Sequence, residues 1–246
     1  MAGLLGAGSV EPLSDPLTLW RFYRAREGDA EAAAAMYRAS LAWRSSFSIQ
    51  EVMATHGSGE EYKANGARMT DSDASWSWQR TADTPEAAFV ARHGFFGRLK
   101  RLAPADGAPV AVWRSVIDVE GIMREGLMDV LERGFVAHLE DLLQTGRAAS
   151  RRRNNVVRCR LIIDIQDMTM GSLLRRIRFV KNLLTLGKAY FPEVNASVTV
   201  VRAPKVVAQL WAVVKPLLTP VMRAKVCILG DDFEAGLREH SGLERS

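Results

Sequence analysis

Residues 190–230, YFPEVNASVTVVRAPKVVAQLWAVVKPLLTPVMRAKVCILG, decide the fold of this chain. They begin with a Phe-Pro-Glu turn and contain two short runs rich in β-branched residues, which is typical of parallel strands covered on both faces. The segment between the runs is apolar nearly all round. A helix of this kind needs apolar contact on both sides, so it is either deep in the core or a lid over an apolar cavity, and we favour the lid.

Outward from this stretch, strand and helix patterns alternate over the C-terminal two-thirds of the chain. Four strands are expected, at 110–118, 156–167, 197–204 and 225–231. The helices between and after them are expected at 120–146, 173–189, about 204–218 and about 232–240. Parallel strands joined in this way need right-handed crossovers, so the pattern predicts an α/β fold with a mostly parallel sheet flanked by helices.

The N-terminal part of the chain has a separate, helical pattern. Asp15 and Pro16 fit the N-cap and first position of a helix, and Asp29 fits the N-cap of a second one. The next fifty residues have no clear period and are predicted to be a partly helical connection. We therefore expect a helical N-terminal lobe at 1–55, the connection at 56–105 and an α/β domain at 106–246.

Recognisable catalytic and cofactor motifs are absent from the sequence. It contains no GxxxxGKS, GxxxxGKT or GxGxxG phosphate loop and no GxSxG nucleophile elbow. The four histidines have no metal-ligand spacing, so neither a metal nor a cofactor is expected. Asp164 and Asp231 follow strands and keep an α/β enzyme as the alternative class, but they lack a partner base, and we predict no catalytic residues.

The charge pattern indicates an anionic partner. The net charge is +5, which favours membranes, phosphates or nucleic acid. Basic residues gather in an expected loop at 147–155 and on the outer face of the helix at 173–189. They are not interleaved with exposed aromatic residues, and no nucleic-acid-binding module is visible. We therefore expect transient contact with an anionic membrane surface and no contact with nucleic acid.

Nothing in the sequence predicts export or a membrane span. The N-terminus lacks the features of a secretory signal, and the longest apolar stretch, 206–222, is interrupted by Lys215 and two prolines. Cys159 and Cys227 fall in strands that we expect to be buried, where cysteine acts as a small apolar residue. The expectation is a cytoplasmic, monomeric protein.

Five segments, in order, carry a resemblance to the CRAL-TRIO lipid-binding and lipid-transfer family, which includes the phosphatidylinositol-transfer proteins. LTLWRFYRARE and the helix ending AWR resemble the leading helical module of that family. DGAPVAVWR resembles its entry to the first strand, and LIIDIQDMT its second strand. YFPEVNASVTVVRAP is similar to its Tyr-Pro-Glu turn and third strand, and WAVVKPLLTPVMRAKVCILG to its Lys-Pro segment and last strand.

The resemblance implies an apolar lipid pocket floored by the sheet and closed by a movable gate helix. Six apolar residues would form the gate and pocket wall: Val207, Leu210, Trp211, Val214, Leu217 and Leu218. Three residues that align with the phosphatidylinositol-binding positions of the family would contact a lipid headgroup: Arg26, Glu193 and Lys225. The implied ligand is a phospholipid, with a phosphoinositide favoured, held by a carrier that associates peripherally with membranes.

Other ligands and roles stay open at this point. The positions near Ala111, Cys159 and Leu161 are apolar where family members that exchange phosphatidylcholine carry hydroxyl residues, so choline-lipid binding of that kind is not implied. The alternatives are a carrier of a single small lipophile and a regulatory module that senses lipid.

Overall fold

The computed structural model describes residues 13–56, 62–64, 78–80, 95–99, 104–114, 119–166 and 168–242. A five-stranded sheet with the strand order β3-β4-β5-β6-β7 lies at its centre. The strands are β3 (Phe95–Leu99), β4 (Val110–Arg114), β5 (Cys159–Asp164), β6 (Asn195–Val201) and β7 (Val226–Ile228). The last four run parallel to one another, and β3 pairs antiparallel with β4 at one edge. The mostly parallel sheet expected from the sequence is confirmed.

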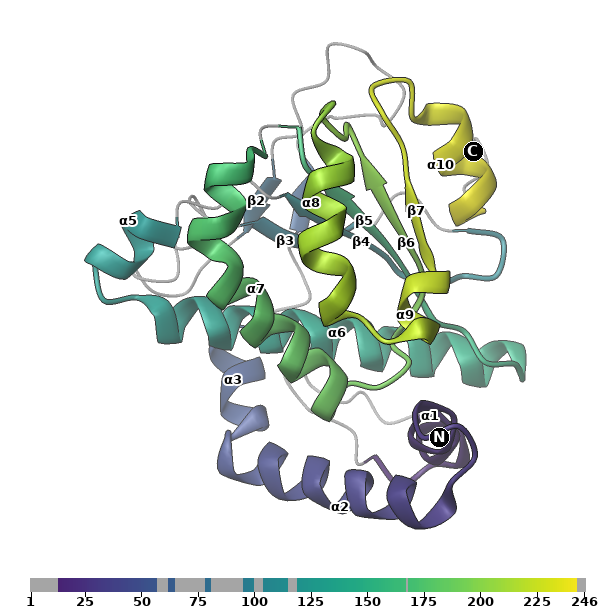
Figure 1. Ribbon diagram of the computed structural model, residues 1–246. Helices are drawn as coiled ribbons and strands as arrows, with labels where there is room; N and C mark the ends of the chain where they lie inside the picture. The colour runs from purple at the N-terminus through teal and green to yellow at the C-terminus, as the bar shows by residue number, and fades with distance from the viewer. Residues whose placement is uncertain are drawn as a thin grey trace.

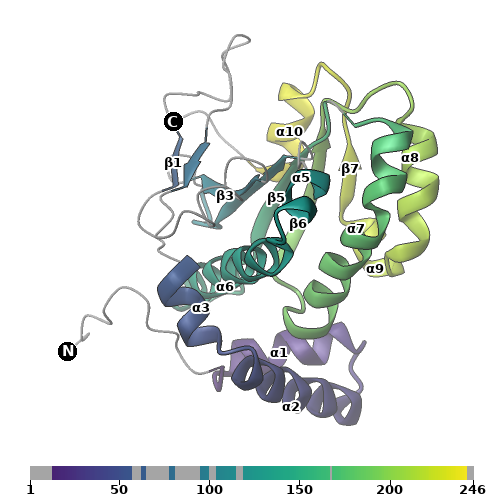
Figure 2. The same cartoon turned by 90° about the vertical axis from the view of Figure 1, so that its left-hand side faces the viewer.

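Helices cover both faces of this sheet. On one face lie α5 (Val119–Arg124), α6 (Met128–Arg153), α7 (Met170–Tyr190) and α8 (Val207–Val214), as Figures 1 and 2 show. On the other face α10 (Glu234–Ser241) packs behind the sheet, with Leu237 against Val110 and Ile162. The main core cluster lies between α6, α7 and the sheet and includes Phe135, which is 1% exposed. A separate two-stranded pair joins β1 (Tyr62–Ala64) to β2 (Trp78–Arg80).

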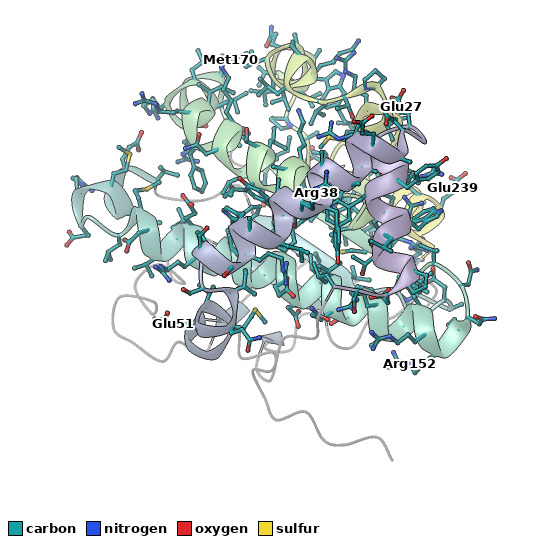
Figure 3. All side chains as sticks on the ribbon, turned by 90° about the horizontal axis from the view of Figure 1, so that it is seen from below. Glu27, Arg38, Glu51, Arg152, Met170 and Glu239 are labelled. Atoms are coloured by element: carbon teal, nitrogen blue, oxygen red, sulfur yellow. The ribbon has the colours of Figure 1, made fainter. Side chains whose placement is uncertain are left out.

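The N-terminal helices pack against α6 and α7. They are α1 (Pro16–Ala25), α2 (Ala30–Ser46) and α3 (Ile49–His56), and Figure 3 views α1 and α2 from below, in front of α6 and α7. The side chain of Asp15 accepts a hydrogen bond from Thr18 N at 3.0 Å, as expected for an N-cap. Buried ion pairs join these helices to α6: Asp15 with Arg147, and Arg44 with Glu140.

The predicted helix at 120–146 and the basic loop at 147–155 are wrong in their boundaries. Gly126, at φ +69°, separates two helices, α5 and α6. Gly146 lies inside α6, which continues to Arg153 and ends at the left-handed Asn154. Arg147 is 1% exposed because its guanidinium pairs with Asp15. The residues expected as a loop are therefore mostly the last turns of a helix, and Arg147 is part of the protein interior.

The last predicted strand is shorter and less buried than expected. β7 has three residues at the sheet edge, and all of them are half-buried. Cys227 therefore differs from Cys159, which is 1% exposed. β7 is less buried because it is the last strand of the described sheet and because Val226 and Ile228 line a cavity. Residues 115–118, the end of the predicted first strand, lie outside the described residues.

The remaining helices complete the apolar segment quoted first. After α8 the chain forms a 3₁₀ turn, η1 (Lys215–Leu217), and a short helix, α9 (Pro220–Ala224). The helix expected at about 204–218 is thus α8 followed by η1, because Pro216 cannot donate a main-chain hydrogen bond within a longer helix. Among the described residues, no helix has both the length and the apolar character needed to cross a bilayer.

Candidate functional site

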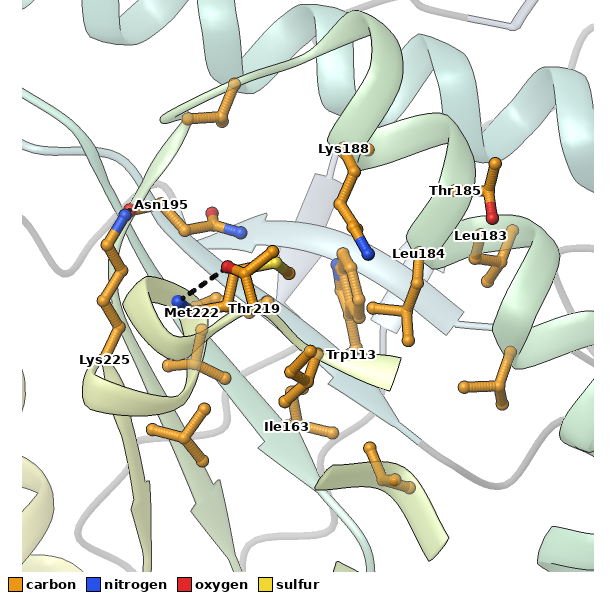
Figure 4. Close-up of a pocket in the computed structure, with 18 of the residues that line it drawn as sticks. Trp113, Ile163, Leu183, Leu184, Thr185, Lys188, Asn195, Thr219, Met222 and Lys225 are labelled. Carbon is orange, nitrogen blue, oxygen red and sulfur yellow. Dashed lines mark hydrogen bonds between the residues drawn. The ribbon is translucent and has the colours of Figure 1, made fainter. Parts of the chain in front are cut away.

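A cavity of about 670 Å³ lies between the sheet and the helices α7 and α8 (Figure 4). Alternate residues of the strands point into it, because successive side chains of a strand face opposite sides of the sheet. The sheet contributes Trp113, Leu161, Ile163, Val198, Val200, Val226 and Ile228. The helices α6 and α7 contribute Phe135, Leu139, Leu173, Phe179, Val180, Leu183 and Leu184. The body of the cavity is therefore mostly apolar, although α7 also contributes Arg176, Thr185 and Lys188, so the expected outward position of the basic residues of this helix is wrong for Arg176 and Lys188.

The third wall is the apolar helix α8 with the residues that follow it. Five of the six residues predicted for the gate line the cavity: Val207, Leu210, Trp211, Val214 and Leu218. Leu217 is not among the lining residues; it lies in η1, and its carbonyl accepts a hydrogen bond from Lys188 Nζ at 3.2 Å. The opposite side of α8 carries Ala208, Gln209 and Ala212, which are exposed. The helix is thus a thin wall between the cavity and solvent.

Glu193 marks one end of the cavity and is surrounded by cations. Its side chain is only 7% exposed. Lys225 Nζ lies 2.7 Å from Glu193 Oε1, and Arg158 NH1 lies 2.5 Å from Oε2. The Nε of Arg24 lies 3.4 Å from the same Oε2. Three cations therefore share one carboxylate, and this end of the cavity, which we call the cationic mouth, keeps a surplus of positive charge.

Two of the three residues predicted for the headgroup are in direct contact, and the third lines the same cavity. Glu193 and Lys225 form the ion pair just described. Arg26 is exposed at the C-cap of α1 and lines the cavity, but the arginine of α1 that pairs with Glu193 is Arg24. The structure thus joins Glu193 and Lys225 directly, adds Arg24 and Arg158 to that ion-pair cluster, and leaves Arg26 as a residue of the cavity lining.

The cationic mouth is held by the main chain as well as by side chains. Glu193 has φ +54°, a left-handed conformation that is uncommon for a residue with a Cβ. Its carbonyl accepts a hydrogen bond from Arg21 NH1 at 2.7 Å. Lys225 Nζ also donates to the carbonyl of Asn195 at 3.3 Å. Turn, helix and strand are therefore fixed relative to one another at this end of the cavity.

Burial changes the acid–base behaviour of Lys225. Loss of solvent lowers the pKa of its ammonium below the ordinary lysine value of 10.5, although the hydrogen bond to Glu193 acts in the opposite direction. A lysine with a lowered pKa gains more from an added anion than an exposed lysine does, because the anion replaces lost solvation.

Asn195 adds an amide to the cavity wall next to Lys225. Figure 4 shows both residues at the same end of the pocket. Among the described residues, the buried Oδ1 of Asn195 has no hydrogen-bond partner. A buried polar atom without a partner is uncommon, so it is a plain candidate for contact with a polar group of a ligand.

Sequence reasoning missed Arg21, Arg24, Arg158 and Asn195. The arginines of α1 belong to the segment quoted for the resemblance, so Arg24 could have been predicted as a headgroup residue alongside Arg26. No local signal marks Arg158 or Asn195, because each precedes or begins a strand in which most neighbours are apolar. Their role depends on which strands lie side by side.

The carboxylates considered for an enzyme do not form a catalytic arrangement. Asp164 is 4% exposed and forms an ion pair with Arg202. Arg202 Nε donates to Asp164 Oδ1 at 3.1 Å, and Arg202 Nη2 donates to Asp164 Oδ2. Asp231 is exposed in the turn after β7. Within the described ranges, no group of three His, Cys, Asp or Glu side chains could hold a metal ion.

Comparisons with known proteins agree with this geometry. A family model described as the CRAL/TRIO domain matches residues 83–245. A CRAL-TRIO domain-containing protein of Caenorhabditis elegans is 26% identical over 228 residues, which are 90% of this chain and 28% of that protein. A CRAL-TRIO domain-containing protein of Saccharomyces cerevisiae is 22% identical over 94% of this chain and 68% of its own length.

Further similarities point the same way. The SEC14 cytosolic factor of Eremothecium gossypii is 23% identical over 94% of this chain and 67% of that protein. The crystal structure of Sfh5 aligns with a TM-score of 0.60 at 12% identity, covering 93% of this chain and 70% of the other, which establishes similarity of fold. The chain spans less than a third of the length of the worm protein and of the Drosophila melanogaster protein named real-time.

Proposed function

Because the chain belongs to the CRAL/TRIO family, whose members bind and transfer lipids, we propose that it holds a phosphoinositide in this cavity and exchanges it at membranes. The observation that carries the proposal is the cationic mouth at the end of a mostly apolar cavity. A diacyl phospholipid has the same division, with two apolar chains and one anionic headgroup. No covalent chemistry is part of this function, and neither a cofactor nor a metal is needed for it.

The apolar body supplies the affinity for acyl chains. Each methylene removed from water contributes about 0.8 kcal/mol, so a chain competes with a bilayer only where the cavity walls contact it closely. The lining of Leu, Val, Ile and Phe side chains from the sheet and two helices meets that requirement. This part of the cavity favours acyl chains over headgroups, because most of its lining side chains are apolar.

The cationic mouth supplies the choice of headgroup. Arginine and lysine donate charge-assisted hydrogen bonds to phosphate oxygens, and the carboxylate of Glu193 can accept hydrogen bonds from inositol hydroxyls. Arg24, Arg26 and Lys225 line the cavity and would donate to the phosphate at this end. A zwitterionic choline headgroup brings a cation and offers no hydroxyl donors, so it fits this end less well than an inositol phosphate.

We further propose that α8 is the gate. Its inner face holds the cavity-lining residues, and its outer face is already exposed, so outward movement uncovers only one set of apolar side chains. In water this exposure is unfavourable, whereas at a bilayer the same side chains exchange the cavity for lipid. The gate would therefore open on membrane contact, and the protein would associate peripherally with membranes from the cytoplasm.

The direct test is native mass spectrometry of the gently purified chain, followed by a transfer assay between vesicles. We expect a co-purified phospholipid whose mass identifies an inositol headgroup, and transfer of labelled phosphatidylinositol at a higher rate than phosphatidylcholine. Recovery of one small lipophile in place of a phospholipid would favour the small-ligand carrier. Binding of a phosphoinositide without transfer would favour the regulatory lipid sensor.

A further inference from the structure

Arg21 of α1 lies directly behind the cationic mouth, and we propose that it is the positioning residue that sets the geometry of the headgroup site. The inference rests on the proposed function, because it concerns the same end of the cavity. Arg21 is not among the residues that line the cavity, so it acts on a ligand only through the residues that it holds.

One guanidinium group holds the two segments that meet at the carboxylate. Arg21 NH1 donates to the carbonyl of Glu193 at 2.7 Å, and NH2 donates to the carbonyl of Val157 at 3.1 Å. Val157 directly precedes Arg158, whose side chain donates to Glu193 Oε2. The planar fork of an arginine fixes two acceptors at a set separation, so Arg21 determines how far Arg158 lies from Glu193.

The contact with Val157 has a rigid support on the side of α6. Ser150 Oγ accepts a hydrogen bond from Val157 N at 2.8 Å. Gly146 faces the same carbonyl, and a Cβ at that position would lie 3.2 Å from Val157 O and 3.7 Å from Arg21 NH2. A side chain there would press on the carbonyl, so glycine leaves the room in which Arg21 and Val157 meet.

The contact with Glu193 holds a residue in an unfavourable backbone conformation. A left-handed residue with a Cβ is strained, and its surroundings must offset that strain. The hydrogen bond from Arg21 to the Glu193 carbonyl is such an interaction. It orients the carboxylate so that Oε1 meets Lys225 on the cavity side while Oε2 meets Arg158.

Burying the charged side chain of Arg21 destabilises the fold unless the charge has a further role. Arg21 is 2% exposed, and burial lowers its pKa to about 10. In the described part of the chain its Nε has no hydrogen-bond partner. A protein with an apolar side chain of similar volume at such a site is often as stable as one with a buried cation. The presence of a charged residue here therefore indicates a role beyond stability. It adds positive potential behind Glu193.

The test compares two lipids with identical chains in the intact protein. The probes are dioctanoyl phosphatidylinositol 4-phosphate and dioctanoylglycerol, which has no headgroup. We expect Arg21→Gln to weaken binding of the phosphoinositide about tenfold, as for loss of one charge-assisted hydrogen bond. Binding of dioctanoylglycerol should stay within about twofold, because the apolar body is unchanged. Arg21→Lys keeps the charge without the fork and should fall between wild type and Arg21→Gln.

Arg147→Gln is the matched control. Arg147 is also a buried cation next to α1, and its replacement removes the ion pair with Asp15 and the hydrogen bond to Gln144 but keeps the two hydrogen bonds of Arg21. It should lower the free energy of unfolding and leave the ratio of the two affinities unchanged. A wild-type ratio in Arg21→Gln would overturn the positioning role while the proposed function stands. If Arg21→Gln does not fold, a wild-type ratio in Arg21→Lys overturns it equally.

Binding of the two lipids by the wild-type chain distinguishes a failure of the positioning role of Arg21 from a failure of the proposed function. If wild type binds dioctanoyl phosphatidylinositol 4-phosphate no more tightly than dioctanoylglycerol, the cationic mouth does not read headgroups. That result would overturn both the phosphoinositide assignment and the role of Arg21.

Discussion

The two ends of the cavity are built in different ways. The apolar body takes its walls from alternate strand residues and from the inner faces of α6, α7 and α8, so each wall follows from a local period. The cationic mouth takes one or two residues each from α1, the segment before β5, the turn before β6 and the end of α9. The body therefore tolerates apolar exchanges, whereas the mouth depends on separate segments meeting within hydrogen-bond distance.

The energetic basis of the two ends differs in the same sense. Contacts in the body add up from many weak and nondirectional terms, and losing one methylene changes binding by about 0.8 kcal/mol. At the mouth a few strong, directional contacts compensate for buried charge, and removing one leaves another unpaired. Polar substitution in the body and neutral substitution in the mouth are thus the two ways to separate lipid retention from headgroup choice.

Leu210→Asp should have the largest effect, because it places a carboxylate in the body. Leu210 is 5% exposed and lines the cavity from α8. Burying a carboxylate without a partner costs several kcal/mol, so binding of any two-chain lipid should fall roughly 100-fold or more. The measurement is binding of dioctanoylglycerol and of dioctanoyl phosphatidylinositol, which should both be lost.

Ala212→Asp is the control for that change, since Ala212 is on the exposed side of the same helix. It should bind both lipids as wild type does. Leu217, which the sequence placed in the gate, should tolerate Asp better than Leu210 does because it does not line the cavity. Equal loss in Leu217→Asp and Leu210→Asp would mean that the gate extends beyond α8.

Glu193→Gln tests the mouth and should come next in size. The change leaves three cations without their shared carboxylate. Removing one member of a fully buried pair costs about 3–5 kcal/mol, and we expect about 2 kcal/mol here because the cations keep solvent contact. Their side chains are 51% exposed for Arg24, 21% for Arg158 and 16% for Lys225. Urea unfolding measures the loss.

The same variant should lose preference for inositol lipids while still binding dioctanoylglycerol. Glu239→Gln removes an exposed carboxylate of α10, on the other face of the sheet, and is the control for a change of net charge. A Glu193→Gln variant with wild-type stability and wild-type preference would contradict the account of the mouth.

The pH dependence of lipid binding should distinguish the contribution of the cationic mouth from that of the apolar body without any mutation. The pKa of Lys225 is lowered by burial, so this lysine loses its proton at a lower pH than an exposed one. Only the protonated form attracts phosphate; affinity for a phosphoinositide should therefore fall as the pH rises through that lowered pKa. Loss of the charge-assisted bond corresponds to about tenfold. Dioctanoylglycerol binding should be flat over the same range, and so should phosphoinositide binding by Lys225→Met.

Asn195→Leu should have the smallest effect and shows how far the mouth extends. If the unpartnered amide contacts the headgroup, its loss removes one neutral hydrogen bond, worth about fivefold in affinity for a phosphoinositide. Isothermal titration with the dioctanoyl lipids would measure it. Asn182→Leu, at an exposed position of α7, is the matched control. Tighter binding of the phosphoinositide by Asn195→Leu would assign Asn195 to the apolar body.

Much of the fold followed from local patterns, and the errors arose where a contact between separate segments decided the structure. Asp15 and Asp29 cap helices as expected, because a cap is decided within three residues. Gly146 was interpreted as a helix end, but its lack of a side chain serves a close contact with Val157 instead. Arg147 was expected on the surface, and only the position of Asp15, 132 residues away, explains its burial.

The sequence by itself determined the order of the four parallel strands, the apolar character of α8 and the chemical nature of Glu193 and Lys225, whereas β3 and the division between α5 and α6 were not predicted. The predicted features depend on periodicity and residue type, which can be read directly from the sequence. Only the tertiary structure decided that Arg158 and Arg24 join them, and that Arg21 fixes their spacing. The hydrogen bonds of Arg21 join residues 172 and 136 positions apart. Contacts between residues so far apart in the sequence arise from tertiary packing, so no local sequence pattern can predict them.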